Sequence, residues 1–220
     1  MSQGAPVPAV HALPDGRRLT WYEFGDPAGR PVIHTAGTPE SGLAGACYHE
    51  AAHQAGLRWI SPDKPGYGGS DFQPGRRLLD WAGDVASLAD HLGLGQFSVA
   101  GESGGGPSTL ALAHQLGERI RVVALLAAMG PPGDARSRVG MRRGIRAMFW
   151  LARHAPALLV VPLTAMSRTL PGPARRGRHP RRGQAEPATD ALAGQHPELR
   201  GRIDAAIDAF RQGPRGGGGG

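Results

Sequence analysis

Short apolar and β-branched runs recur along the first 130 residues and predict strands. They occupy residues 19–24, 31–34, 57–61, 96–100 and 121–128, and several of them end in a turn rich in Gly, Pro or Asp. The last run, RVVALLAA, is apolar at every position after its first residue. Such continuity is typical of a strand that is buried on both faces of a sheet.

Helical patterns separate these runs. One stripe at helical spacing consists of Leu78, Ala82, Val85, Ala89 and Leu92. Residues 104–116 predict a second helix, because Pro107 is tolerated in a first turn and Gly117 marks the end. Strands that alternate with helices favour βαβ units, so the predicted fold class is α/β with a mostly parallel sheet and flanking helices.

The pattern changes after residue 131. Arg-rich helical patterns cover residues 134–170 and 197–212, and the stretch between them is rich in Pro, Gly and Arg, which indicates loop or disorder. The chain therefore divides into an α/β core over 1–131, an Arg-rich helical insertion over 132–212, and a disordered glycine tail over 213–220.

Composition excludes several classes of protein. The 220 residues fit one large domain with a sizeable core. The single cysteine, Cys47, excludes an internal disulfide framework, and the single lysine, Lys64, precedes proline and so cannot belong to a P-loop. The first 18 residues lack the apolar segment of a signal peptide, and no apolar run is long enough for a bilayer span. We expect a cytoplasmic protein that does not act in a membrane.

Charge is distributed unevenly. Residues 1–130 carry a net charge of −3 and residues 131–220 a net charge of +10. Such asymmetry can indicate binding to nucleic acid or anionic surfaces. Because no aromatic residues alternate with the arginines, a solvated Arg-rich segment is the favoured interpretation and no nucleic-acid partner is expected. Binding of anions by the basic segment 136–182 stays open as an alternative.

A G-x-S-x-G motif carries the candidate chemistry. It spans residues 101–105 and lies between a predicted strand and a predicted helix. The serine of such a turn needs glycines two residues before and after it, and its Oγ is then free to attack a carbonyl. Ser103 is therefore the candidate nucleophile, and the Gly104 N–H is the candidate oxyanion donor. The competing interpretation is a glycine-rich turn that packs closely or holds a phosphate.

A second oxyanion donor is expected from the loop that follows an earlier strand. Gly37-Thr38-Pro39 follows the strand predicted at 31–34 and fits that place. The Thr38 N–H is therefore the second candidate donor. The alternative is a proline-containing turn without a function.

Three stretches carry a family resemblance. VAGESGGGP, HTAGTPE and SPDKPGYGGSD resemble the signature stretches of the α/β-hydrolase fold superfamily, in its lipase/esterase and peptidase-like branch, and the likeness covers roughly residues 17–212. The resemblance implies a helical lid after the sixth strand, Ser103 as nucleophile, and Thr38 and Gly104 as oxyanion donors. It further implies hydrolysis of an ester or amide bond in a small molecule, without a cofactor. Residues 63–71 match a structural turn whose charges hold loops.

The rest of a catalytic triad is not apparent. In the family the acid and then the histidine follow the serine along the chain, each after a further strand. No strand is predicted after residue 128, and no later histidine stands in the place of a base; these are His114, His154, His179 and His196. Asp134 is the one acid near the expected position, although a helix N-cap explains it better. We therefore expect a C-terminally truncated chain, impaired or inactive as an enzyme.

One metal pattern needs mention. His49-Glu50-Ala51-Ala52-His53 has the order of an HExxH zinc motif. A zinc protease also needs a third ligand and an open cleft, whereas this stretch falls on the first helix after the oxyanion loop, where a surface helix is expected. The predicted site therefore contains no metal, with zinc kept as a minor alternative.

Overall fold

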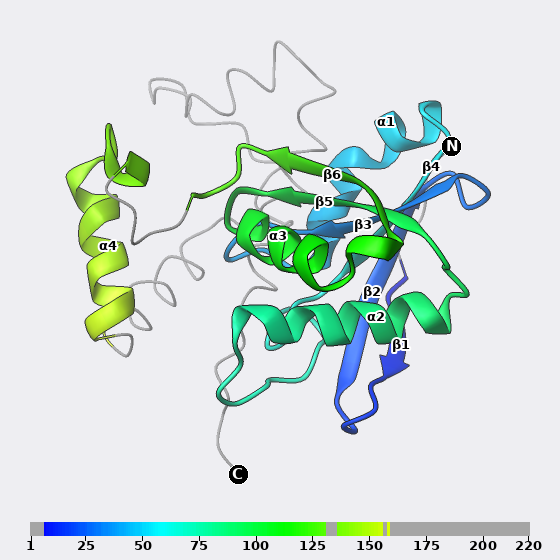
Figure 1. Ribbon diagram of the computed structural model, residues 1–220, viewed down its shortest axis with the longest axis horizontal. Coiled ribbons are helices and arrows are strands. Elements are labelled where there is room, and N and C mark those ends of the chain that lie inside the picture. Colours follow the sequence, from blue (N-terminus) through cyan, green and yellow to red (C-terminus); the bar gives the residue numbers. More distant parts are fainter. Residues whose placement is uncertain (1–6, 131–135, 156–157, 159–220) are drawn as a thin grey trace, which may run out of the picture. The chain divides into compact units, whose positions relative to one another are not determined.

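The computed structural model describes residues 7–130, 136–155 and 158 (Figure 1). The described residues divide into two compact units, one that ends at Met129 and one that begins at Gly130. Each unit is described by itself.

The first unit is built on a six-stranded sheet with the order β1-β2-β4-β3-β5-β6. Strands β4, β3, β5 and β6 are parallel, β2 is antiparallel to β4, and β1 is antiparallel to β2. The mostly parallel α/β fold is thereby confirmed. Only the four-residue strand β1 had no counterpart in the sequence pattern. The strands are β1 (Ala9–Ala12), β2 (Arg18–Gly25), β3 (Arg30–Thr35), β4 (Leu57–Pro62), β5 (Phe97–Glu102) and β6 (Ile120–Leu126).

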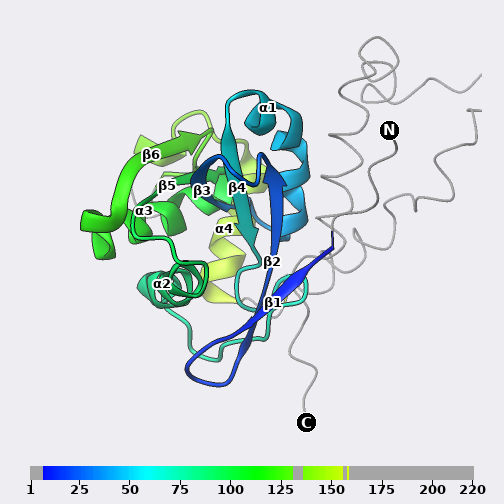
Figure 2. The ribbon, with the colours of Figure 1, turned by 90° about the vertical axis from the view of Figure 1, so that its right-hand side faces the viewer.

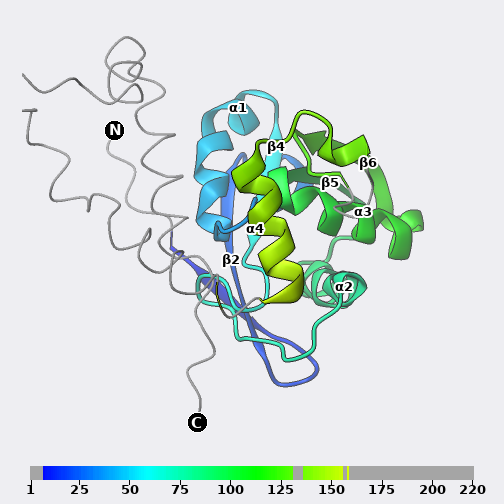
Figure 3. The same cartoon turned by 90° about the vertical axis from the view of Figure 1, so that its left-hand side faces the viewer.

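Helices cover both faces of this sheet. Helix α1 lies on one face and helices α2 and α3 lie on the other, as the three ribbon views show (Figure 1, Figure 2 and Figure 3). Short 3-10 segments lead into each of these helices. The helical elements of this unit are η1 (Gly42–Tyr48), α1 (His49–Gln54), η2 (Leu78–Asp80), α2 (Trp81–His91), η3 (Ser103–Gly105), α3 (Gly106–Gln115) and η4 (Gly117–Arg119).

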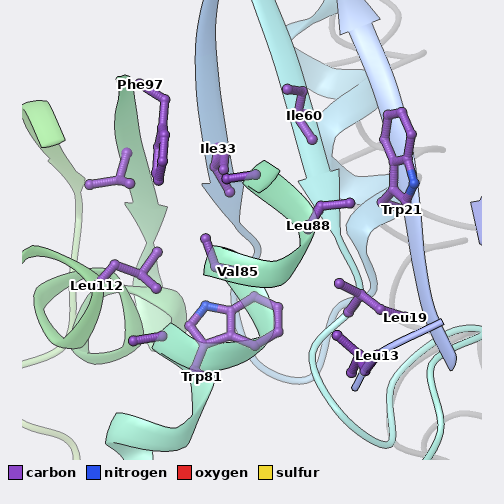
Figure 4. Packing of buried hydrophobic residues seen from close by; sticks show 13 residues of the cluster. Leu13, Leu19, Trp21, Ile33, Ile60, Trp81, Val85, Leu88, Phe97 and Leu112 are labelled. Carbon is purple, nitrogen blue, oxygen red and sulfur yellow. The ribbon is translucent and has the colours of Figure 1, made fainter. Parts of the chain in front are cut away.

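The central strands are buried on both faces. Side chains of neighbouring residues point to opposite faces of a strand, and here both directions meet a core. Ile33 and Ile60 pack with Trp81 and Leu88 of α2 in the larger cluster (Figure 4). On the other face a second cluster contains Val32, Trp59 and Ala52, the last from α1. Two-sided burial explains why apolar residues follow one another in these strands, as Val32 and Ile33 do in β3 and Trp59 and Ile60 do in β4.

Strand β6 departs from the prediction. It lies at the edge of the sheet and pairs only with β5 among the described residues. Its apolar side chains are exposed: Val122 is 58% exposed, Val123 40% and Leu125 44%. The expectation of a strand buried on both faces is therefore wrong for the described part of the chain. An apolar run shows that a strand could be buried. The position of the strand in the sheet decides whether other elements cover it.

The described part of the second unit is short and basic. It contains η5 (Arg136–Arg138) and helix α4 (Arg143–His154), which confirms helix within the range predicted from residue 134 onward. Arg143, Arg146 and Arg153 of this helix are exposed. The helix predicted at 197–212, the Pro-rich stretch, the glycine tail and Asp134 lie outside the described residues. No helix in the part of the chain that the structure describes is long and apolar enough to cross a membrane.

Candidate active site

The candidate nucleophile lies at the turn between β5 and α3. Ser103 has a φ of 45°, in the left-handed region, and its side chain is exposed. For a residue other than glycine this conformation costs about 1–2 kcal/mol. The Met129 N–H donates to the Ser103 carbonyl at 2.9 Å, so the segment after β6 helps to hold the turn. The serine is therefore presented on a strained strand–turn–helix bend.

The glycines around this serine make room for neighbouring elements. A Cβ on Gly101 would lie 2.1 Å from Thr109 Oγ1 of α3. A Cβ on Gly105 would lie 2.1 Å from the Thr35 carbonyl oxygen at the end of β3. Both distances are far inside van der Waals contact, so the turn can pack against helix and strand only with glycine at these positions.

The structure brings the predicted oxyanion residues together. The loop after β3 passes so close to the turn that a Cβ on Gly104 would lie 3.1 Å from Thr38 N. A Cβ on Gly37 would lie 3.4 Å from the Ser103 Cβ. Thr38 is exposed, as Ser103 is. The backbones of Thr38 and Gly104 therefore lie side by side next to the serine.

A buried lysine contacts the same loop. Lys64 follows β4, is 4% exposed, and donates from Nζ to the carbonyl oxygens of Ala36 at 2.7 Å and Gly37 at 2.9 Å. Its Nζ lies 4.7 Å from the centre of the Tyr67 ring. Burial lowers the pKa of Lys64 to about 8, and the charge of Arg76 acts in the same direction. The sequence placed residue 64 in a structural turn but gave no sign of these partners.

Two carboxyl groups meet beside the turn. Burial raises the pKa of Glu40 to about 7, and the hydrogen bond and charge of Glu102 act in the same direction. The Tyr48 hydroxyl donates to Glu102, and the pKa of Tyr48 is raised by burial and by this carboxylate. A Cβ on Gly37 would lie 3.0 Å from Glu40 Oε2, on the loop that also contacts Ser103. Glu40 therefore keeps its proton to a higher pH than an ordinary carboxyl group, close to the loop that contains Gly37.

The histidine of the HTAGTPE stretch, His34, makes buried contacts within the sheet. His34 is fully buried, its Nδ1 forms a hydrogen bond with Ser61 Oγ at 2.9 Å, and its ring packs on Trp59. Burial lowers the pKa of His34 to about 4, so the ring is neutral at physiological pH. It stabilises the sheet beneath the loop and offers no exposed base.

No hydrogen bond joins the Ser103 side chain to a described histidine. His114 is exposed near the end of α3, and His154 ends helix α4 of the second unit. His179 and His196 lie outside the described residues.

The zinc pattern gains no third ligand in the structure. His49 and His53 both lie on α1, and His49 Nδ1 accepts a hydrogen bond from the Gly25 N–H at 3.0 Å. Within residues 7–130, 136–155 and 158, no three His, Cys, Asp or Glu side chains form a group that could hold a metal ion.

Comparison with known proteins places the fold. The model of the alpha/beta hydrolase fold family matches residues 31–169, and the chain belongs to this family. An alpha/beta hydrolase fold protein from Nakamurella multipartita has 27% identity and a TM-score of 0.61 over 95% of this chain and 70% of its own. A thermophilic esterase from Thermogutta terrifontis, with 22% identity and a TM-score of 0.57 over 96% of this chain and 68% of its own, shares the fold.

Curated relatives match over shorter stretches. The acetyltransferase component of an acetoin cleaving system from Pseudomonas putida is 33% identical over 116 residues, which is 52% of this chain and 31% of that protein. An uncharacterised hydrolase from Bacillus subtilis is 28% identical over 141 residues, 57% of this chain and 50% of that protein. The chain thus spans about a third to a half of the length of these relatives.

Proposed function

We propose that this chain carries the nucleophile and the oxyanion donors of a serine hydrolase that acts on an ester or amide bond of a small apolar molecule. Ser103 Oγ attacks the carbonyl carbon, and the N–H groups of Thr38 and Gly104 bind the oxygen that becomes negative. The observation that carries the proposal is the exposed serine at φ 45° beside the Thr38 and Gly104 backbones. The alpha/beta hydrolase family match supports this choice over a phosphate-binding turn.

The proton of the serine needs an acceptor. A serine hydroxyl is a weak nucleophile without a base, and loss of one member of a triad lowers the rate by several orders of magnitude. No described histidine forms a hydrogen bond with the Ser103 side chain. We therefore propose that the described part supplies half of the catalytic apparatus, and that acid and base lie elsewhere or are lost. Reaction with a strong electrophile is then the suitable readout, because it does not need turnover.

Covalent labelling tests the nucleophile. The folded protein is incubated with a fluorophosphonate, and the modified peptide is located by mass spectrometry. We expect label on Ser103, none on Ser103→Ala, and unchanged labelling of Ser108→Ala, a variant that removes a neighbouring buried hydroxyl of α3. A folded wild-type sample that takes up no label at Ser103 would show that this serine is not activated, and would refute serine hydrolase activity for this chain.

A second function is favoured by one observation on the second unit. Arg142, Arg143, Arg146 and Arg153 are all exposed on or next to helix α4. We propose as the alternative that the basic segment 136–182 binds an anionic partner and that the chain is otherwise an inactive remnant. Titration with DNA and with vesicles of acidic lipid at rising salt is the test, because phosphate contacts weaken steeply with salt. Negligible binding at low salt excludes this alternative.

A further inference from the structure

The only lysine of the chain lies under the candidate oxyanion loop. Lys64 Nζ donates to the carbonyl oxygens of Ala36 and Gly37, the two residues that precede Thr38. The Gly37 carbonyl and the Thr38 N–H belong to one planar peptide group. Since the carbonyl and N–H of a trans peptide point in opposite directions, an ammonium that fixes the Gly37 oxygen also fixes the direction of the Thr38 N–H.

The other side of the loop is held by the serine turn. A Cβ on Gly105 would lie 2.7 Å from the Ala36 oxygen, and a Cβ on Gly104 would lie 2.8 Å from the Thr38 Cβ. The Glu40 N–H also donates to the Gly37 oxygen, at 3.1 Å. The loop is therefore confined between the turn above and Lys64 below. Its peptide groups have little freedom while both contacts persist.

Tyr67 adds a third contact. Lys64 Nζ lies over its ring, and the Thr38 side chain is near enough to its hydroxyl to lower the pKa of Tyr67, against the larger effect of burial. Burial raises the pKa of Tyr67, so the hydroxyl stays protonated at neutral pH. Lys64 thus holds the backbone of the loop, and Tyr67 lies next to both Lys64 and the Thr38 side chain.

The stability of the fold does not explain why a charged lysine is buried at position 64. Burial disfavours the ammonium form of Lys64, and Arg76 disfavours it further. Glu40, Glu102 and Asp63 favour the charged form, without restoring the ordinary pKa. A buried cation that is held at a cost beside a candidate site is more typical of function than of packing.

We propose that Lys64 is a positioning residue, which fixes the peptide groups of Ala36 and Gly37 and thereby aims the Thr38 N–H at the oxyanion. The expected effect of Lys64 on the reactivity of Ser103 rests on the proposed function. Its expected effect on the order of the loop does not. Lys64 touches no reacting atom and acts through the loop.

Two measurements on the full chain test this role. Lys64→Met keeps the length of the side chain and removes its charge, and Lys64→Arg restores a charged donor. Arg58→Met is the matched control, because Arg58 lies on β4 and forms an ion pair with Glu23, away from the loop. We expect Lys64→Met to slow fluorophosphonate labelling by about 10- to 100-fold, as a misplaced oxyanion donor does. Lys64→Arg should recover part of the rate, and Arg58→Met should react as the wild type.

Amide hydrogen exchange is the second measurement. We expect the amides of residues 36–38 to exchange at least about 10-fold faster in Lys64→Met, with β5 unchanged, because local opening follows the loss of local contacts. Equal labelling rates in Lys64→Met and wild type would overturn the effect on reactivity and leave Ser103 as nucleophile. If the folded wild type takes up no label, the proposed function fails, and exchange alone decides whether Lys64 holds the loop.

Amide hydrogen exchange of the wild-type protein tests the same role even if Lys64→Met does not fold. Because the pKa of Lys64 is about 8, wild-type protein at pH 7 and at pH 9.5 compares the charged with the neutral amine. The pKa of Glu40 is about 7, so the same comparison in Glu40→Gln removes the contribution of that carboxyl group. After correction for intrinsic exchange, the amides of residues 36–38 should open more readily at the higher pH than those of β5. Equal protection at both pH values would contradict the role of Lys64.

Discussion

The left-handed backbone of Ser103 should be measurable as stored strain. Glycine adopts a φ of 45° without the steric cost that alanine and serine carry, about 1–2 kcal/mol. Glycine also loses more backbone freedom on folding, which offsets about 0.5–1 kcal/mol of this gain. Ser103→Gly should therefore be more stable than Ser103→Ala by about 0.5–1 kcal/mol. Both variants lack the hydroxyl, so the comparison isolates the backbone.

Urea unfolding of the two variants is the assay, with thermal unfolding as a second probe. In a chain of this size 1 kcal/mol corresponds to about 2–4 °C in Tm. Ala86→Gly, in the interior of helix α2, is the control with the opposite sign, because glycine costs about 1 kcal/mol relative to alanine in a helix. If Ser103→Gly is no more stable than Ser103→Ala, the turn is relaxed and the argument for a strained nucleophile fails.

Three further predictions concern packing, pH and association. Gly105→Ala should lower the free energy of unfolding in urea by about 1–3 kcal/mol, because the new Cβ would lie 2.1 Å from a backbone oxygen. Gly83→Ala is the control: its Cβ would have nothing within 4 Å, so the free energy of unfolding should not fall. The pKa of Glu40 is raised from 4.5 to about 7, so between these pH values the folded state holds a proton that the unfolded chain has released. The free energy of unfolding should therefore fall as the pH rises from 4.5 to about 7. If Glu40→Gln shows the same dependence of the free energy of unfolding on pH, Glu40 is not its origin. Val122→Lys should reduce self-association measured by sedimentation, because it charges the 58% exposed edge strand β6; equal association of variant and wild type would show that this edge does not mediate it.

Local features of the sequence were enough for the fold class and for the candidate nucleophile. Short apolar runs that end in turn residues predicted the strands, and helical spacing predicted the helices, so the alternation of strands and helices was visible without a structure. The glycines around Ser103 were equally informative, because a turn this tight admits no side chain at residues 101 and 105. The Gly37-Thr38-Pro39 loop could be proposed because it follows an earlier predicted strand. The structure showed that this strand is the neighbour of the one that leads to the serine.

Tertiary structure alone decided what surrounds that turn. Lys64 reaches Ala36 across 28 residues of sequence, and Tyr48 reaches Glu102 across 54. These pairs form because β3, β4 and β5 end at one edge of the sheet, and no local pattern records which loops meet there. The same reason explains β6: its apolar run predicted burial, but its place at the edge of the described sheet left Val122 and Leu125 exposed. Composition determines what a segment can bury, whereas the order of strands determines whether anything lies against it.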